Sequence, residues 1–485
     1  MSRPSRCWSG VAALTGLAFL VPAAGAATDN VFTVAGTGMA DFTGDGVLAT
    51  AAPLNTPIGV VAAADGGTLI ADLNNHRVRR VSPSGTITTV AGTGVPGSSA
   101  DGVRATAAQI NDPIAVAVTT DGGFVFVERG SQRVRRVSPG ATIATVAGTG
   151  ASGFSGDGGP AIGARLNGPS AVAMAADGGV LIADTANHRV RRVSPGGTIT
   201  TVAGTGASGF SGDDGPATAA ALSAPSGVAA TAEGGVLIAE TANHRVRRVS
   251  PGGTISTVAG TTRGFSGDGG PARAAQLDFP FAVAVAADGV VLIADFGNHR
   301  VRRVSPGGMI TTVVGTGAPG FAGDGGPATS AQITGPAGLA LTAEGGVLVA
   351  DALDHRVRFV DVDLRSPASG PRGPGGPAGP SGPLGPGADR LAVALATDRL
   401  RARPRQRLRV RYAASATAAV ELRVLRAGRR IARARGRARA GANAIRLRAP
   451  RKAGRYRLVL TAVAADGQRS SDRVRLTVLK PRRAA

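Results

Sequence analysis

The segment His188-Arg189-Val190-Arg191-Arg192-Val193 belongs to a repeat that decides how this chain folds. The first residue of each copy is His76, Gln132, His188, His244, His299 or His355, and the last copy reads His-Arg-Val-Arg-Phe-Val. Successive copies lie 56 residues apart, except for 55 between His244 and His299. A second marker, Thr-Val-Ala-Gly-Thr-Gly, begins at Thr33, Thr89, Thr145 and Thr201, with variants at Thr257 and Thr312. This period predicts a stacked or radial repeat architecture.

Each repeat contains four strand-like runs. In residues 169–204 they are 170–175, 180–184, 188–193 and 198–203, separated by the turn signals Asp177-Gly178-Gly179 and Pro195-Gly196-Gly197. Four antiparallel strands repeated radially are typical of a propeller blade. Only five copies of the fourth strand follow six copies of the first three, and the missing one is 31–36. We therefore predict an all-β, six-bladed β-propeller over 27–364, closed by its N-terminal strand, which removes two open sheet edges.

The repeated residues resemble those of a known family. Val-Leu-Ile-Ala-Asp, Asn-His-Arg-Val and the connecting Gly-Phe-Ser-Gly-Asp-Gly-Gly-Pro-Ala are similar to the NHL repeat, in the 56-residue form of bacterial exported and teneurin-type NHL proteins. Blade two departs most, at 127–132. The resemblance implies a propeller that binds proteins, nucleic acids or glycans, whereas a minority of related six-bladed propellers are metal-dependent enzymes.

The N-terminus predicts export. Arg3 and Arg6 precede a short apolar run, and Ala24-Gly25-Ala26 offers a small-residue cleavage pattern, so we expect a signal peptide over 1–26. The single cysteine, Cys7, would leave with it, so a mature protein would have no disulfide and no thiol-based metal site. No later stretch is apolar enough to span a bilayer. We therefore expect a secreted or envelope-associated protein.

The charge is concentrated at the C-terminal end. The whole chain has a net charge of +23, and residues 389–485 alone carry 28 Arg and Lys against 5 Asp and Glu. A Gly/Pro-rich linker over 365–388, with six Gly-Pro-x triplets, favours a semi-rigid spacer over a collagen-like trimer. Alternating apolar and charged residues then predict a small immunoglobulin-like β-sandwich over 389–480, followed by a basic tail, 481–485.

The basic domain predicts attachment to a polyanion. Its candidate contacts are the arginines of two alternating runs: Arg405, Arg407, Arg409, Arg411, Arg455 and Arg457. Such a field attracts anionic envelope polymers. Nucleic acid is less favoured, because aromatic residues for base stacking are only 3% of the chain. The bland alternative is compositional bias, since arginine greatly outnumbers lysine.

Three repeated sets of residues are expected on the propeller face that carries the long inter-blade loops. The carboxylates that end the second strands are Asp72, Glu128, Asp184, Glu240, Asp295 and Asp351. The five histidines would stand on the order of 16 Å from the axis, too far apart to share a metal ion, so a hydrogen-bonding role in a turn is favoured. The loop aspartates are Asp45, Asp101, Asp157, Asp213, Asp268 and Asp324, for which a turn followed by a short proline-led helix is favoured over a calcium loop.

The positions that vary between repeats are the candidate ligand-binding residues. They precede the proline of the first strand, nearest the axis: Asn55, Asn111, Asp112, Asn167, Ser223, Asp278, Phe279 and Thr334. A ring of differing polar groups suits a ligand mouth, and a solvated rim is the alternative. The first strands contain no His, Cys, Asp or Glu, and no phosphate loop or nucleophile motif is present. We therefore predict a binding protein for a protein or glycan ligand, without a cofactor, with a metal-dependent propeller hydrolase or lyase as the alternative.

Overall fold

The computed structural model describes residues 30–343 and 345–361, and the strands of a C-terminal part between 393 and 478. These residues fall into two compact units. The predicted signal peptide, linker and basic tail lie outside the described residues. No helix among the described residues is long and apolar enough to cross a bilayer.

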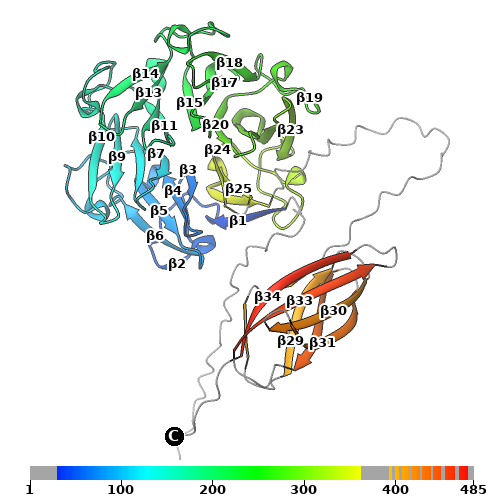
Figure 1. Cartoon of the computed structure of the whole chain (residues 1–485). Coiled ribbons are helices and arrows are strands. Elements are labelled where there is room, and N and C mark those ends of the chain that lie inside the picture. Colours follow the sequence, from blue (N-terminus) through cyan, green and yellow to red (C-terminus); the bar gives the residue numbers. More distant parts are fainter. Residues whose placement is uncertain are drawn as a thin grey trace, which may run out of the picture. The chain divides into compact units, whose positions relative to one another are not determined.

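The first unit is a ring of six four-stranded antiparallel blades (Figure 1). Blade 1 contains β3 (Pro57–Ala62), β4 (Thr68–Asp72), β5 (Arg77–Val81) and β6 (Thr86–Ala91). Blade 2 contains β7 (Pro113–Val118), β8 (Phe124–Glu128), β9 (Arg133–Val137) and β10 (Ile143–Ala147). Blade 3 contains β11 (Pro169–Met174), β12 (Val180–Asp184), β13 (Arg189–Val193) and β14 (Ile199–Ala203).

The remaining blades continue the pattern. Blade 4 contains β15 (Pro225–Ala230), β16 (Val236–Glu240), β17 (Arg245–Val249) and β18 (Ile255–Ala259). Blade 5 contains β20 (Pro280–Val285), β21 (Val291–Asp295), β22 (Arg300–Val304) and β23 (Met309–Val314). Blade 6 contains β24 (Pro336–Leu341), β25 (Val347–Asp351) and β26 (Arg356–Val360). The first strands of neighbouring blades contact one another all the way round, including β24 against β3.

The N-terminal strand closes the ring, as the count of repeats predicted. β1 (Val31–Ala35) pairs antiparallel with β26 and supplies the fourth strand of blade 6. In this pairing Phe32 stands opposite Phe359, which occupies the position of an arginine in the five other copies. A Cβ atom on Gly346 would lie 2.3 Å from the Phe359 ring, so glycine is needed there to make room for it.

The inter-blade loops run along the outer edges of the blades. β2 (Val47–Leu48) pairs with β6 and β19 (Gly270–Pro271) pairs with β23, so these two blades gain a short fifth strand. Isolated bridges such as Pro160–Thr198 and Pro216–Thr254 cover the same edge elsewhere. Covering an outer strand removes its exposed backbone donors and acceptors from further pairing.

The helices of the propeller are single 3₁₀ turns. After the loop prolines or their equivalents come η1 (Ala49–Ala51), η3 (Ala105–Ala107), η4 (Ala161–Gly163), η6 (Ala217–Ala219), η8 (Ala272–Ala274) and η10 (Ala328–Ser330). Between the second and third strands come η2 (Leu73–Asn75), η5 (Thr185–Asn187), η7 (Thr241–Asn243), η9 (Phe296–Asn298) and η11 (Ala352–Asp354). The loop prolines stand just before the first helical residue, as at Pro160, rather than at it.

The hydrophobic core lies between adjacent blades. Leu181 and Val190 of blade 3, for example, pack with Val228 and Ile238 of blade 4, and five further clusters occupy the other blade junctions. Most of its side chains are small or branched. The first strands leave a central cavity of about 90 Å³. This cavity is smaller than the pockets that hold drug-sized ligands.

The second unit is all-β and forms two sheets. One contains β27 (Val393–Leu395), β29 (Arg407–Ala414) and β32 (Gly441–Arg448). The other contains β28 (Arg399–Ala402), β30 (Ala418–Arg426), β31 (Arg429–Ala438), β33 (Gly454–Ala464) and β34 (Arg469–Val478). Val420, Leu422 and Val424 of β30 are buried in alternation. The immunoglobulin-like topology stays a prediction.

Candidate functional site

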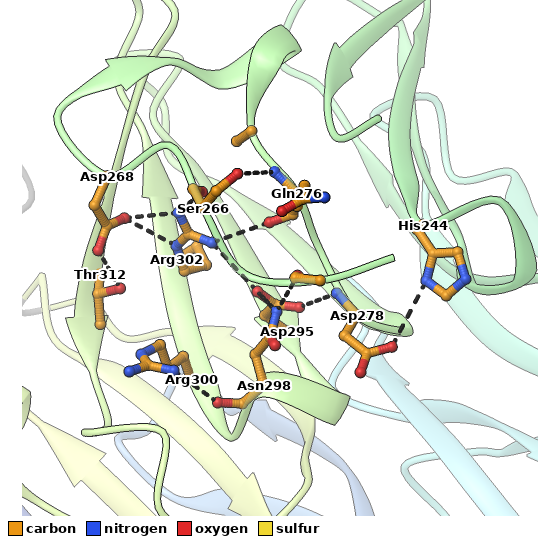
Figure 2. A network of polar contacts seen from close by, with 12 residues as sticks. His244, Ser266, Asp268, Gln276, Asp278, Asp295, Asn298, Arg300, Arg302 and Thr312 are labelled. Carbon is orange, nitrogen blue, oxygen red and sulfur yellow. Dashed lines mark hydrogen bonds and ion pairs between the residues drawn. The ribbon is translucent and has the colours of Figure 1, made fainter. Parts of the chain in front are cut away.

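In each blade the fourth residue of the His-Arg-Val-Arg-Arg-Val segment is a fully buried arginine. These arginines are Arg79, Arg135, Arg191, Arg247, Arg302 and Arg358. Figure 2 shows Arg302 between Asp268 of the inter-blade loop and Asp295 at the end of β21, at 2.7 and 3.3 Å. The guanidinium group also donates to the backbone carbonyls of Ser266 and Gln276. A buried cation requires this degree of pairing, so the network is part of the scaffold.

The carboxylates that end the second strands belong to this network. All six are fully buried: Asp72, Glu128, Asp184, Glu240, Asp295 and Asp351. Asp295 accepts hydrogen bonds from the Asp278 backbone N–H at 2.7 Å and from Asn298 Nδ2 at 2.8 Å. Burial raises the pKa of Asp72 and of Asp295 to about 6, although the neighbouring arginines oppose the shift. These carboxylates are removed from solvent and position the loop.

The loop aspartates hold the buried arginine from the other side. Asp45, Asp101, Asp157, Asp213, Asp268 and Asp324 each form an ion pair with the buried arginine of their blade. The second oxygen of Asp268 accepts a hydrogen bond from Thr312 Oγ1 at 2.6 Å. Sequence reasoning favoured a simple turn and missed this counter-ion role. The signal lay in the strict pairing of each Gly-Asp with one arginine per repeat.

A phenylalanine of the same loop covers the arginines in five blades. Phe265 lies over the guanidinium groups of Arg300 and Arg302, 3.8 and 4.8 Å from its ring centroid. The equivalent residues are Phe42, Phe154, Phe210 and Phe321. Blade 2 has Ser98 instead, whose hydroxyl binds Glu128, Arg133 and Arg135. The divergence of blade 2 therefore replaces a cation–π contact with hydrogen bonds.

The histidines connect adjacent blades, which confirms the hydrogen-bonding role predicted for them. Each adopts a left-handed conformation, such as φ 51° at His188, just before the third strand rather than inside it. Its Nδ1 atom accepts the backbone N–H of the residue before the first-strand proline in the next blade, as at Ala224 (3.1 Å). Gln132 Oε1 does the same for Gly168 at 2.6 Å, and His355 completes the ring at Thr56. An accepting Nδ1 requires an unprotonated nitrogen.

The predicted mouth residues form a ring, and the structure assigns part of their role to the scaffold. The backbone N–H groups of Asn55, Asn167, Ser223, Asp278 and Thr334 donate to the second-strand carboxylates of their own blades. Asp112 and Phe279 have positive φ, and their N–H groups bind His76 and His244. Side-chain partners differ from blade to blade: Asn74 binds Asn55, Ser208 binds Ser223, and Asn111 faces Gly130. Ligand binding by this ring stays a prediction.

Blade 5 differs most from the others at the mouth. Arg263 Nε donates to Asp278 Oδ1 at 3.0 Å, and the Arg263 guanidinium carbon lies 5.0 Å from the Phe279 ring centroid. His244 contacts the other side of the cluster, 5.0 Å from Phe279 between ring centroids and 3.8 Å from Asp278 between Nδ1 and Oδ1. Sequence reasoning named Asp278 and Phe279 but missed Arg263. The single 55-residue interval was the available signal, because Arg263 lies in the shortened loop.

Blade 6 contains an irregular carboxylate pair. In blades 1, 3, 4 and 5 an asparagine of the turn donates to the second-strand carboxylate. Asp354 takes that place in the repeat, and its Oδ2 atom is buried without a hydrogen-bond partner. Burial and the nearby Asp354 charge raise the pKa of Asp351 to about 7. The Asp351–Asp354 pair therefore lacks the N–H donor that the asparagine supplies in those four blades.

No group of three or more His, Cys, Asp or Glu side chains suited to a metal ion occurs among the described residues. The predicted polyanion-binding arginines lie on the second unit: Arg407, Arg409 and Arg411 on β29, and Arg455 and Arg457 on β33. Arg405 lies outside the described residues.

Comparison with known proteins supports the repeat assignment. Residues 252–305 match the Teneurin NHL domain, and residues 166–193 match the NHL repeat. Teneurin-4 of Mus musculus is 31% identical over 279 residues, which cover 49% of this chain and 10% of teneurin-4. The Arabidopsis thaliana protein SUPPRESSOR OF QUENCHING 1, chloroplastic, is 33% identical over 100 residues, 20% of this chain and 9% of that protein. The chain thus spans about a tenth of the length of these relatives.

A solved structure shows the same fold. A Bacteroides thetaiotaomicron protein of unknown function superposes with a TM-score of 0.52 at 18% identity, covering 68% of this chain and 75% of the other. At this identity the likeness shows the fold alone.

Proposed function

We propose that this chain, an NHL-repeat six-bladed propeller, is a non-catalytic binding protein of the cell exterior that recognises a protein or glycan ligand with the loop-bearing face. One observation carries the proposal. On this face the repeated carboxylates and loop aspartates are paired with buried arginines, and the histidines accept backbone hydrogen bonds. The variable mouth residues are what distinguishes one blade from the next, as expected of contacts on a rigid scaffold.

The basic C-terminal unit would attach the protein to anionic surface polymers. Its 28 Arg and Lys residues against 5 Asp and Glu give a field that falls off within about 10 Å at 0.1 M salt. Arg407, Arg409 and Arg411 alternate along one strand, which suits repeated contacts with a linear polyanion. Attachment of this kind concentrates the propeller near the surface without specifying its ligand.

Co-sedimentation with cell-envelope fragments tests whether the basic unit, rather than the propeller, attaches the protein to the envelope. Residues 27–364 and 389–485 would be produced separately and sedimented at low and at high salt. We expect the basic piece to be retained at low salt and released at high salt, and the propeller to depend little on salt. If neither piece sediments, envelope attachment is wrong.

The catalytic alternative makes a different prediction. A metal-dependent hydrolase or lyase would lose its activity with EDTA and on replacement of Asp112 or Asp278. Activity with that profile would replace the binding proposal.

A further inference from the structure

The loop that enters blade 5 departs from the repeat in both length and charge. It is one residue shorter than its counterparts and places Arg263 in a backbone bridge to Leu277, where the matching bridges elsewhere use Ala40, Ser152 and Ser208. The Arg263 side chain is 66% exposed. An exposed cation has thus replaced a small residue at one point of an otherwise regular ring.

Aromatic residues replace smaller ones at the mouth of this blade, and one of them, Phe279, lies beside the cation. Phe279 takes the place of Thr56 and Ala224 in other blades, and it remains 36% exposed. Phe296 takes the place of Thr185 and Thr241, and its ring lies 5.9 Å from that of Phe281. Gly297 has no side chain, and a Cβ atom there would lie 2.6 Å from the Asp278 carboxyl carbon. Gly297 therefore leaves room for the Asp278 carboxyl group.

One hydrogen bond orients the Arg263 side chain but leaves part of its hydrogen-bonding capacity unused. Asp278, only 14% exposed, accepts the hydrogen bond from Nε. The two terminal nitrogens of Arg263 have no hydrogen-bond partner among the described residues. A guanidinium group has a second edge formed by these nitrogens, which matches a carboxylate in bidentate geometry. Asp278 thus fixes the side chain and leaves that edge for an anion.

We propose that Arg263, Asp278 and Phe279 form a binding site for a uronic acid residue of an acidic polysaccharide. The sugar carboxylate would bind the free edge of Arg263, and the C–H face of the pyranose ring would lie on Phe279. Hydroxyl groups would meet Asp278 and the amide of Gln276, which donates to Thr262 beside the arginine. This inference rests on the proposed function of the loop face and names its ligand class.

A glycan suits this surface better than an extended peptide. Peptides that bind β-proteins commonly add a strand to an open sheet edge. The outer edges of these blades are already covered by the inter-blade loops, as β19 covers β23 in blade 5. The site instead offers ring faces flanked by polar groups, which requires no backbone pairing.

Calorimetric titration of the full chain with trigalacturonic acid tests the site. Arg263→Ser and Phe279→Thr restore residues found in other blades and should therefore keep the fold. Arg273→Ser removes an exposed arginine of the same blade outside the site and serves as the matched control. We expect Arg263→Ser to weaken binding about tenfold, Phe279→Thr to weaken it severalfold, and Arg273→Ser to leave it unchanged.

The carboxyl-reduced trisaccharide separates charge from ring stacking. It should bind the wild type about as weakly as the acid binds Arg263→Ser. Equal affinity together with an equal number of bound trisaccharides in wild type and Arg263→Ser would overturn the uronate site, because any sites on the basic C-terminal unit are present in both. Tighter binding of an acidic peptide, abolished by Phe279→Thr, would also overturn it while leaving the loop face as a binding surface. Loss of both ligand classes from the propeller would instead reject the proposed function.

Discussion

Arg191 and Arg192 are neighbours in β13, yet one is fully buried and the other reaches the surface to pair with Asp177. A propeller blade is covered on both sides by other blades, so charge alone does not reveal which residue is exposed. The sequence showed that an Asp, an Arg and a Gly-Asp recur together. It could not show that they meet, because the loop aspartate lies 34 residues before its arginine. Pairing across that separation depends on the path of the loop along the blade.

Asp354 supports a prediction at the same scale. The folded-state pKa of Asp351, raised to about 7, exceeds its ordinary value of about 3.8. The contribution of protonated Asp351 to the free energy of unfolding is therefore complete below pH about 4 and is lost as pH rises through 7. Asp354→Asn supplies the missing donor and should raise the free energy of unfolding by about 1–2 kcal/mol at pH 8, and by less at pH 5.

Urea denaturation at the two pH values measures this difference. Asn298→Asp, the reverse exchange in blade 5, is the matched control and should lower stability at pH 8. A loss of stability in Asp354→Asn at pH 8 would show that Asp354 has a favourable partner that asparagine cannot replace.

At the scale of the element, the junction between blades was more predictable than the interior of a blade. The recurrence of the histidines favoured a hydrogen-bonding turn, and Gln132 fits because its amide oxygen is an acceptor like Nδ1. The strand positions were also close: β12 has the predicted bounds, whereas β13 begins at Arg189 because His188 is left-handed. Sequence patterns locate alternation well, but a positive φ at a histidine has no compositional marker.

His299 allows the junction to be tested. Burial lowers the pKa of His299 from its ordinary value, so the stability from its unprotonated ring is present above pH about 6.5 and is lost as pH falls through the lowered value. His299→Gln should keep the melting temperature at pH 7.5, since Gln132 occupies the same turn, and should lose less than wild type at pH 5.

His299→Ala is the comparison variant and should lose about 1 kcal/mol at pH 7.5, because the Gly335 N–H is left without its acceptor. Thermal melts at both pH values provide the measurement. If the glutamine variant is as unstable as the alanine variant, the ring contacts of the histidine matter more than its hydrogen bond.

At the scale of the whole molecule, counting repeat markers was sufficient to predict six blades and the closing strand. The same reasoning could not place a ligand, because the mouth residues also serve the scaffold through their backbone N–H groups. The site in blade 5 depends on Arg263 and Asp278, which lie 15 residues apart in the shortened loop. Their proximity follows from the path of that loop, not from local pattern.

Removal of residues 30–35 tests the closure. The deletion exposes the edge of β26 and frees the Gly325 and Gly326 backbone groups that bind Val31. We expect a lower melting temperature and concentration-dependent association, because an unpaired edge recruits other chains. Size-exclusion chromatography and thermal melts measure both. Phe32→Thr keeps the backbone pairing, so this variant should be monomeric once it has folded. An unchanged deletion variant would mean that β1 contributes little to closure.

Because the six blades are nearly identical, the N-terminal strand has several similar edges with which it can pair during folding. While the N-terminal strand is still free, the edge of any third strand resembles its proper partner in backbone and in most side chains. The Phe32–Phe359 pair, with Gly346 beneath it, distinguishes one edge from the five that carry arginine. Pairing with a wrong blade would place the Phe32 side chain against an arginine. It would also leave the blades beyond that point outside the closed ring. The Phe32–Phe359 pair thus favours the complete ring over smaller rings in which the N-terminal strand has paired with the wrong blade.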